Sequence, residues 1–448
     1  MRSRVKTKES KGDFLKGAAW IAVGGFIAKL IGALYRIPLV NLIGGRGLGL
    51  YQLVYPVYCL LLTVSAIGIP SSIAKLTAER IARGESGRGV FKTAMRLFVW
   101  IGLAGSILMM AIAPFLSKAQ GSREVLTGYF VLAPSVLLVS AISVFRGWFQ
   151  GRNNMFPTAL SEVIEQAVKV GFGLLFAYLF RNNVIKAVVL LLLSVTLSEL
   201  VTLLMMYILF QRIPAPSVYK KQGEKTSVQT VLKMSLPVTL NSLLLPLSGV
   251  LDSILAPRLL GAYAADAITL FGLFSGGAVT MINLPVSICY GLAAASIPRI
   301  AKAKERGQKL RKNIFFSLGL TVLVGVVSAV GLYILAEPAA KIIFRSLAAN
   351  ELKTLTGLIK AFSISALTLS GVQTLSACLT AQGKPQYAAL SMMLALTMKT
   401  GLYVFWLRDP TVSVFGLAYA TNIAYAVAFF LDLLYNMYVS RKKRTKNG

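Results

Sequence analysis

Histidine is absent from the 448 residues of this chain, and cysteines and acidic residues are few. Without an imidazole, a histidine-based metal or catalytic site is excluded, and any proton relay has to use carboxyl groups. The three cysteines, Cys59, Cys289 and Cys378, are odd in number and lie in apolar runs. The sequence therefore predicts no disulfide framework and gives no sign of a cofactor.

Charged residues as a whole are also scarce. Charged residues make up 14% of the chain, hydrophobic residues make up 56%, and the mean hydropathy is +0.70. An average soluble domain contains about 25% charged residues. Apolar runs of about 20 residues recur along the whole chain, which is typical of an all-α polytopic membrane protein. The first run is too long for the core of a signal peptide, so we expect a retained helix.

The apolar runs predict about twelve spans. They lie at 14–38, 47–69, 92–114, 125–147, 158–180, 186–209, 231–257, 267–297, 314–336, 354–380, 387–407 and 413–438. With a cytoplasmic N-terminus, the cytoplasmic segments hold about three times as many Lys and Arg residues as the external loops. Both termini are therefore predicted to be cytoplasmic. The net charge of +31 then reflects topology and attraction to anionic lipids, not nucleic-acid binding.

The two halves of the chain resemble each other. The predicted divisions are a cytoplasmic tail at 1–13, a six-helix lobe at 14–209, a cytoplasmic linker at 210–230, a second six-helix lobe at 231–438 and a basic cytoplasmic tail at 439–448. Residues 150–152 and 159–171 recur at 382–384 and 389–401, so that Lys169 matches Lys399. Because each repeat has an even number of spans, the repeats are expected to be parallel, with a transport cavity between them.

One face of the first span combines glycines with cations. Gly25, Lys29, Gly32 and Arg36 follow one another at spacings of four, three and four residues, which places them on one side of a helix. A cation inside a bilayer is costly unless it faces a cavity or a partner. This face therefore favours a cationic cavity that accepts an anion. The alternative is that Lys29 snorkels to the interface and Arg36 marks the end of the span.

The span at 158–180 carries Glu162, Glu165 and Lys169, and the acid-first spacing of Glu165 and Lys169 favours a local ion pair. The matching part of the second repeat lacks both acids. Lys399 is therefore a candidate ligand for an anion, unless Asp252 or Asp432 reaches it from another helix.

Polar residues also line two spans of the second half. Asn241, Ser248 and Asp252 share one face of the span at 231–257. Small and polar residues, Asn283 among them, follow one face of the span at 267–297. Such stripes usually face the interior of a helix bundle. Asn241, Asp252 and Asn283 are therefore candidates to line the cavity, together with Lys29, Arg36, Lys169, Glu165 and Lys399.

Four segments resemble a known family. The arrangements at 34–39, 44–52, 146–166 and 251–253 are similar to those of the stage V sporulation protein B branch of the multidrug/oligosaccharidyl-lipid/polysaccharide exporter superfamily, which is related to the lipid II flippases. The resemblance implies two six-helix lobes in a V, alternating access, a bacterial cytoplasmic membrane and a role in cell-wall polysaccharide synthesis or sporulation. It also implies that Lys29 and Arg36 take the place of the cavity cations on helix 1 of lipid II flippases.

Three functions compete. The leading hypothesis is a flippase, not an enzyme, that moves an undecaprenyl-pyrophosphate-linked saccharide to the outer leaflet. Its partners would be this lipid-linked saccharide, membrane lipids and, as a further candidate, the cell-wall synthesis machinery. The alternative is a cation-coupled multidrug antiporter that uses carboxylates from the set Glu165, Glu199, Asp252 and Asp432. A membrane glycosyltransferase is disfavoured because the sequence shows no large extramembrane segment, acid cluster or glycine-rich phosphate loop.

Overall fold

The computed structural model describes residues 11–213, 227–232, 235, 242–305 and 310–442. Within these ranges the regular structure consists of helices, and no strand occurs. This confirms the predicted all-α polytopic membrane fold.

The helices form two compact units. The first contains Met1–Leu39, Val57–Phe115 and Glu124–Pro246, and the second contains Val40–Pro56, Leu116–Arg123 and Leu247–Gly448. The two short segments in the second unit come from the N-terminal half of the chain. The predicted lobes, which divide at the 210–230 linker, stay a prediction.

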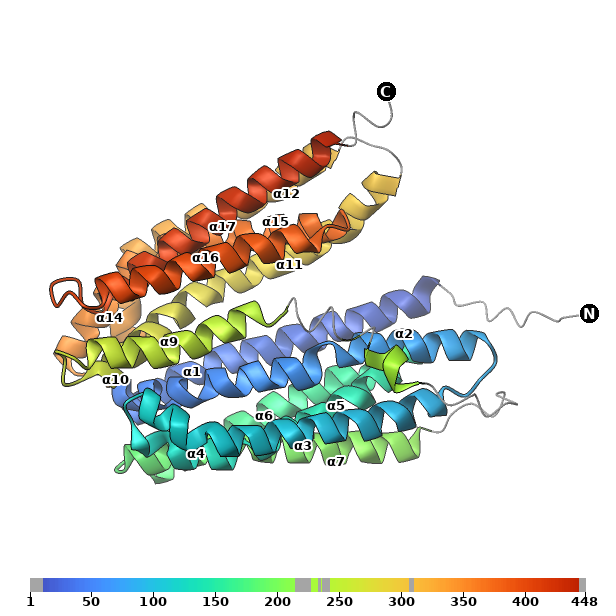
Figure 1. Ribbon diagram of the computed structural model, residues 1–448, viewed down its shortest axis with the longest axis horizontal. Helices are drawn as coiled ribbons and strands as arrows, with labels where there is room; N and C mark the ends of the chain where they lie inside the picture. Colours follow the sequence, from blue (N-terminus) through green and yellow to red (C-terminus); the bar gives the residue numbers. More distant parts are fainter. Residues whose placement is uncertain (1–10, 214–226, 233–234, 236–241, 306–309, 443–448) are drawn as a thin grey trace, which may run out of the picture. The chain divides into compact units, whose positions relative to one another are not determined.

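Between residues 11 and 213, the structure describes seven α-helices and a π-helix, with a short 3-10 helix at Arg123–Val125. They are α1 (Lys11–Leu62), the π-helix η1 (Thr63–Ile67), α2 (Ile69–Ala82), α3 (Arg88–Ala119), α4 (Leu126–Leu132), α5 (Pro134–Gly151), α6 (Phe156–Leu179) and α7 (Val184–Arg212). Gly44 interrupts α1 with a φ of 67°, a conformation that glycine adopts without steric cost. In the first unit, α6 packs against both α5 and α7, and α2 packs against α5 (Figure 1).

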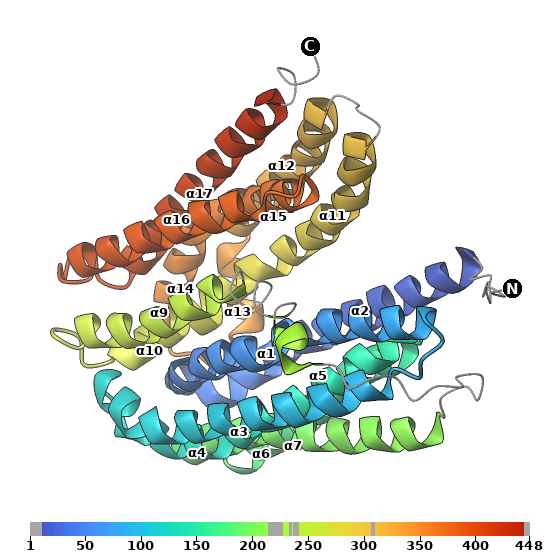
Figure 2. The same ribbon diagram turned by 45° about the vertical axis from the view of Figure 1, so that its right-hand side comes forward.

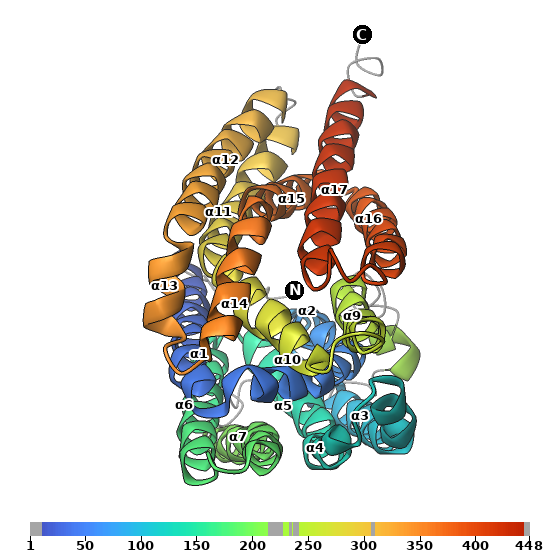
Figure 3. The ribbon, with the colours of Figure 1, turned by 90° about the vertical axis from the view of Figure 1, so that its left-hand side faces the viewer.

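The second unit holds the later helices. They are α9 (Leu244–Leu260), α10 (Ala267–Gly272), the π-helix η3 (Leu273–Ala278), α11 (Val279–Glu305), α12 (Leu310–Ile334), α13 (Ala336–Ile343), α14 (Ala349–Phe362), α15 (Ile364–Ala381), α16 (Pro385–Trp406) and α17 (Phe415–Lys442). α11, α12 and α15 pack together (Figure 2), and α16 lies beside α17 (Figure 3). The pairs α6–α7 and α16–α17 come from matching places in the two sequence repeats.

Nine helices in the described ranges are long and apolar enough to cross a membrane. The predicted count of twelve is not confirmed, for identifiable physical reasons. The first two predicted spans fall in one stretch, Val23–Ala82. α6 carries three charges, at Glu162, Glu165 and Lys169, and α9 is described for only 17 residues.

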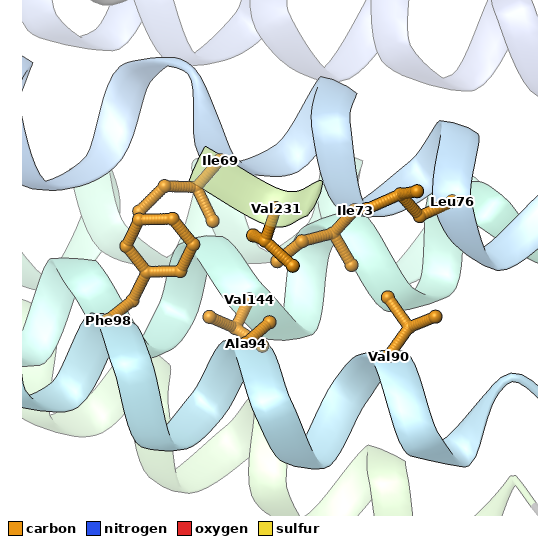
Figure 4. Close-up of a cluster of buried hydrophobic side chains, with 8 residues drawn as sticks. All are labelled: Ile69, Ile73, Leu76, Val90, Ala94, Phe98, Val144 and Val231. Carbon is orange, nitrogen blue, oxygen red and sulfur yellow. The ribbon is translucent and has the colours of Figure 1, made fainter. Parts of the chain in front are cut away.

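One buried cluster of the first unit consists mainly of branched side chains. Ile69, Ile73 and Leu76 of α2 pack against Val90, Ala94 and Phe98 of α3, with Val144 and Val231 completing the cluster (Figure 4). Burial of each large side chain in this cluster contributes about 1.5 to 3 kcal/mol in water-based measurements. Within a bilayer, van der Waals packing supplies more of that stabilisation. This cluster fixes α5, which carries one of the charged residues of the candidate site.

Close packing of α1 on α6 depends on Gly24. A Cβ atom at this position would lie 2.6 Å from Cβ of Ala159 and 2.9 Å from its Cα. We expect Gly24→Ala to destabilise the protein by about 1 to 3 kcal/mol, because the overlap includes backbone. Gly171→Ala is the matched control, since a Cβ there meets nothing within 4 Å. Thermal unfolding of both variants in the same detergent checks this, and equal melting temperatures would contradict it.

Candidate functional site

The glycine-lined face of α1 packs against α6. A Cβ atom on Gly25 would lie 3.5 Å from the Glu162 carboxylate, and one on Gly32 would lie 3.3 Å from the Gln166 side-chain oxygen. Lys29 belongs to α1 between these two glycines, but its side chain lies outside the described part of the structure. The face predicted from the sequence is therefore a helix contact, and it brings the polar side of α6 next to α1.

Glu165 pairs with an arginine from the neighbouring helix α5. Nη2 of Arg146 lies 2.9 Å from Oε2 of Glu165, and its Nε donates to Oγ of Ser161 at 2.8 Å. Gln166 donates to the other oxygen of Glu165 at 3.3 Å. Both charged side chains are mostly buried, with exposures of 15% and 19%. The local ion pair between Glu165 and Lys169 does not form, because a stronger partner occupies the carboxylate.

Lys169 has no ion-pair partner among the described residues. Its half-buried side chain makes no hydrogen bond or ion pair with any residue that the structure describes. Its charge interacts with those of Glu165 and Glu199, and with the second cation, Arg36. Like charges that approach each other in a region of low dielectric repel, so a bound anion would stabilise the pair. The structure thus brings together three of the predicted site residues, Lys169, Glu165 and Arg36.

A further ionisable group, Glu199 of α7, lies in the same region. Its side chain is only 3% exposed. The Tyr58 hydroxyl donates to Oε1 over a long 3.5 Å, and Oε2 has no hydrogen-bond partner among the described residues. The sequence pointed to Glu199 only as a carboxylate of the antiporter alternative. Its burial came from the packing of α7 on α5 and α6, which no local pattern reveals.

In the second unit, Lys399 is neutralised. Its Nζ lies 2.8 Å from Oδ2 of Asp252 and 2.6 Å from Oγ of Ser248, both on α9. Nζ also lies 5.1 Å from the centre of the Tyr403 ring. Of the two interpretations that the sequence left open, the structure shows the interhelical partner. Asp432, the other candidate partner, instead accepts a hydrogen bond from Ser376 at 2.7 Å.

The structure describes one of the two predicted asparagines. Asn241 lies outside the described residues. Asn283 is an exposed residue of α11, and no described contact links it to Lys399 or Asp252. Whether either lines a cavity stays a prediction.

The clearest signal that the sequence interpretation missed was Arg146. It lies in the segment 146–166, which also contains Glu165, and a helix–turn–helix of that length brings its two helices side by side. The pairing of Arg146 with Glu165 could therefore have been anticipated. With that pairing, Lys169 and not Lys399 becomes the cation without a partner.

The comparisons with known proteins agree with this fold. Residues 14–301 match the family described as polysaccharide biosynthesis protein. Stage V sporulation protein B of Bacillus subtilis (strain 168) is 27% identical over 426 residues, which cover 92% of this chain and 81% of that protein. Lipid II flippase MurJ of the same strain is 22% identical over 454 residues, again 92% of this chain and 81% of the relative.

A solved structure shares the fold. An inward-facing multidrug resistance MATE family transporter of the MOP superfamily superposes with a TM-score of 0.81 at 17% identity, covering 93% of this chain and 96% of the transporter. Together with the relatives, this confirms the resemblance to the stage V sporulation protein B branch and a multi-pass membrane protein. Because the family match spans more than half of its residues, the chain belongs to the polysaccharide biosynthesis protein family.

Proposed function

We propose that this protein is a flippase that moves an undecaprenyl-pyrophosphate-linked saccharide to the outer leaflet of a bacterial cytoplasmic membrane by alternating access. The relatives include a protein named as a lipid II flippase, which supports a lipid-linked substrate. The observation that carries the proposal is Lys169, a half-buried ammonium without an ion-pair partner in the described structure, near the second cation Arg36.

The diphosphate group of the proposed substrate supplies negative charge to the cluster around Lys169. A diphosphate carries about two negative charges, and each charge-assisted contact to it gains strength in a site of low dielectric. Lys169 and Arg36 bind the diphosphate in this proposal, and Lys29 lies on the same face of α1. The saccharide, which hydrocarbon excludes, travels with the diphosphate while the prenyl chain stays in lipid.

The antiporter alternative depends on carboxylates that are free to bind a cation. In the described structure, Glu165 forms an ion pair with Arg146, and Asp252 forms an ion pair with Lys399. An ion-paired carboxylate is a weaker cation ligand, because the competing positive charge is already in place. The test of the flippase proposal also distinguishes this alternative.

Lys169→Met should lower translocation of a fluorescent undecaprenyl-pyrophosphate-linked saccharide in proteoliposomes about 10- to 100-fold, the loss of one charge-assisted hydrogen bond. Arg36→Ala should lower it similarly. Lys92→Met, which removes an exposed lysine from α3 of the same unit, is the matched control and should keep full activity. Full activity of Lys169→Met would contradict the role proposed for Lys169, and a wild type that does not translocate the saccharide would favour the antiporter.

A further inference from the structure

Glu199 has hydrogen bonding that suits an acid better than an anion. It is 97% buried, Oε2 has no partner in the described structure, and Oε1 receives one long hydrogen bond from Tyr58. Glu165, by contrast, accepts hydrogen bonds from both Arg146 and Gln166. A buried carboxylate without compensating donors is strongly disfavoured, and binding one proton removes the cost.

The helices that pack around α7 offer few other groups to balance a charge on Glu199. α4 contributes only Tyr129 as a titratable side chain, and α5 contributes Arg146, which Glu165 already engages. α6 contributes Glu165 and Lys169, whose charges interact with Glu199, and Glu162, whose charge interacts with Arg146. α1 contributes Tyr58, which donates a hydrogen bond to Glu199. It also contributes Cys59 and Arg36, which interact electrostatically with Lys169. Arg146 and Lys169 are the cations whose charges interact with Glu199, and because Glu165 already engages Arg146, Lys169 is the one that an ionised Glu199 could capture.

The charge of the cluster consequently depends on Glu199. With a proton on Glu199, the ions Arg146, Glu165 and Lys169 carry a net charge of +1, from two cations and one carboxylate. Without that proton the net charge is zero. In the first state Lys169 is available to an external anion, whereas in the second state the Glu199 carboxylate competes with that anion for the same ammonium.

We propose that Glu199 is a proton-binding site and that its proton keeps Lys169 available to the anionic group of the substrate. This inference rests on the proposed function and adds its regulation. The only bond that forms or breaks is the O–H bond of Glu199, and the proton comes from and returns to water. Because the coupling is reciprocal, a bound diphosphate strengthens proton binding by the same factor by which the proton strengthens diphosphate binding.

The first test measures binding of a short-chain prenyl diphosphate to the full chain in lipid nanodiscs by calorimetry, at about pH 6 and about pH 9. Relative to Glu199→Gln, which mimics the protonated acid, the wild type should bind equally at the lower pH and about tenfold more weakly at the higher pH. The comparison cancels the titration of the ligand itself. Glu79→Gln, which removes an exposed carboxylate from α2, should follow the wild type.

The second test observes the proton directly. The infrared stretch of a protonated carboxyl should be present in the ligand-free wild type at neutral pH, absent from Glu199→Gln and lost at high pH. Absence of the band at every pH overturns the inference, and so does a wild-type affinity that parallels that of Glu199→Gln. A band without binding of the diphosphate to any variant overturns the proposed function and the coupling, yet leaves Glu199 as a proton site.

Discussion

Lys399→Met should lower the free energy of unfolding by about 3 kcal/mol, because it leaves Asp252 without its cation. The Lys399 side chain is 5% exposed and that of Asp252 is 21% exposed, so the effect belongs at the lower end of the range for a broken buried pair. The hydrogen bond to Ser248 is lost in the same substitution. Reversible unfolding in mixed micelles, followed by tryptophan fluorescence, gives the measurement.

A second substitution distinguishes the effect of the stranded Asp252 charge from the effect of the lost Lys399 side-chain packing. Adding Asp252→Asn to Lys399→Met removes the stranded charge and should restore most of the lost stability, because replacing both partners is far less costly than removing one. The matched control is Lys341→Met in the exposed pair with Glu337, which should leave stability unchanged. A Lys399→Met variant as stable as this control would show that the buried pair contributes nothing.

The fold was largely predictable because the bilayer restricts the possibilities. A spanning segment must satisfy its own backbone, so a long apolar run predicts a helix. The span expected at 158–180 corresponds to α6 at Phe156–Leu179, and the one at 387–407 corresponds to α16 at Pro385–Trp406. The predicted helix boundaries were less accurate near Gly44. A single residue with positive φ lets two helices follow each other there with no loop between them.

The candidate site was only partly predictable. Side chains on one helix face can be placed from spacing alone, so Arg36 could be assigned to the glycine-lined face of α1. Ion pairs between helices depend on packing, and the partners of Lys399 on α9 lie about 150 residues earlier in the chain. Comparison of the two repeats therefore identified Lys399 as lacking a local acid, but it could not show that Asp252 replaces that acid.

Lys169 of the first unit and Lys399 of the second unit occupy matching sequence positions but have different partners. Lys399 is held by a carboxylate, a hydroxyl and an aromatic ring. Lys169 has no ion-pair partner in the described structure, because Arg146 occupies Glu165. Two helices with matching sequence patterns thus carry a structural cation in one unit and a candidate ligand for an anion in the other. The difference between the two lysines depends on Arg146, because Arg146 pairs with Glu165. Substitution of Arg146 is therefore a direct test of the site.

Arg146→Ala should reduce translocation of the lipid-linked saccharide about 100-fold without any direct contact between Arg146 and the substrate. Removal of the guanidinium leaves the Glu165 carboxylate without an ion-pair partner, and Lys169 follows it by one helical turn. Glu165 then captures Lys169, and the diphosphate loses its ligand. Arg146→Lys should retain part of the activity, since an ammonium replaces the charge but not the second hydrogen bond to Ser161.

The double variant Arg146→Ala/Glu165→Gln provides the decisive comparison. It removes both members of the pair, so Lys169 is available again and translocation should recover to within about tenfold of the wild type. Adding Lys169→Met to this background should abolish the recovery. Thermal unfolding of each variant controls for loss of structure. If the double variant is stable but as inactive as Arg146→Ala, Arg146 contacts the substrate itself, and the role assigned to it here as a positioning residue is wrong.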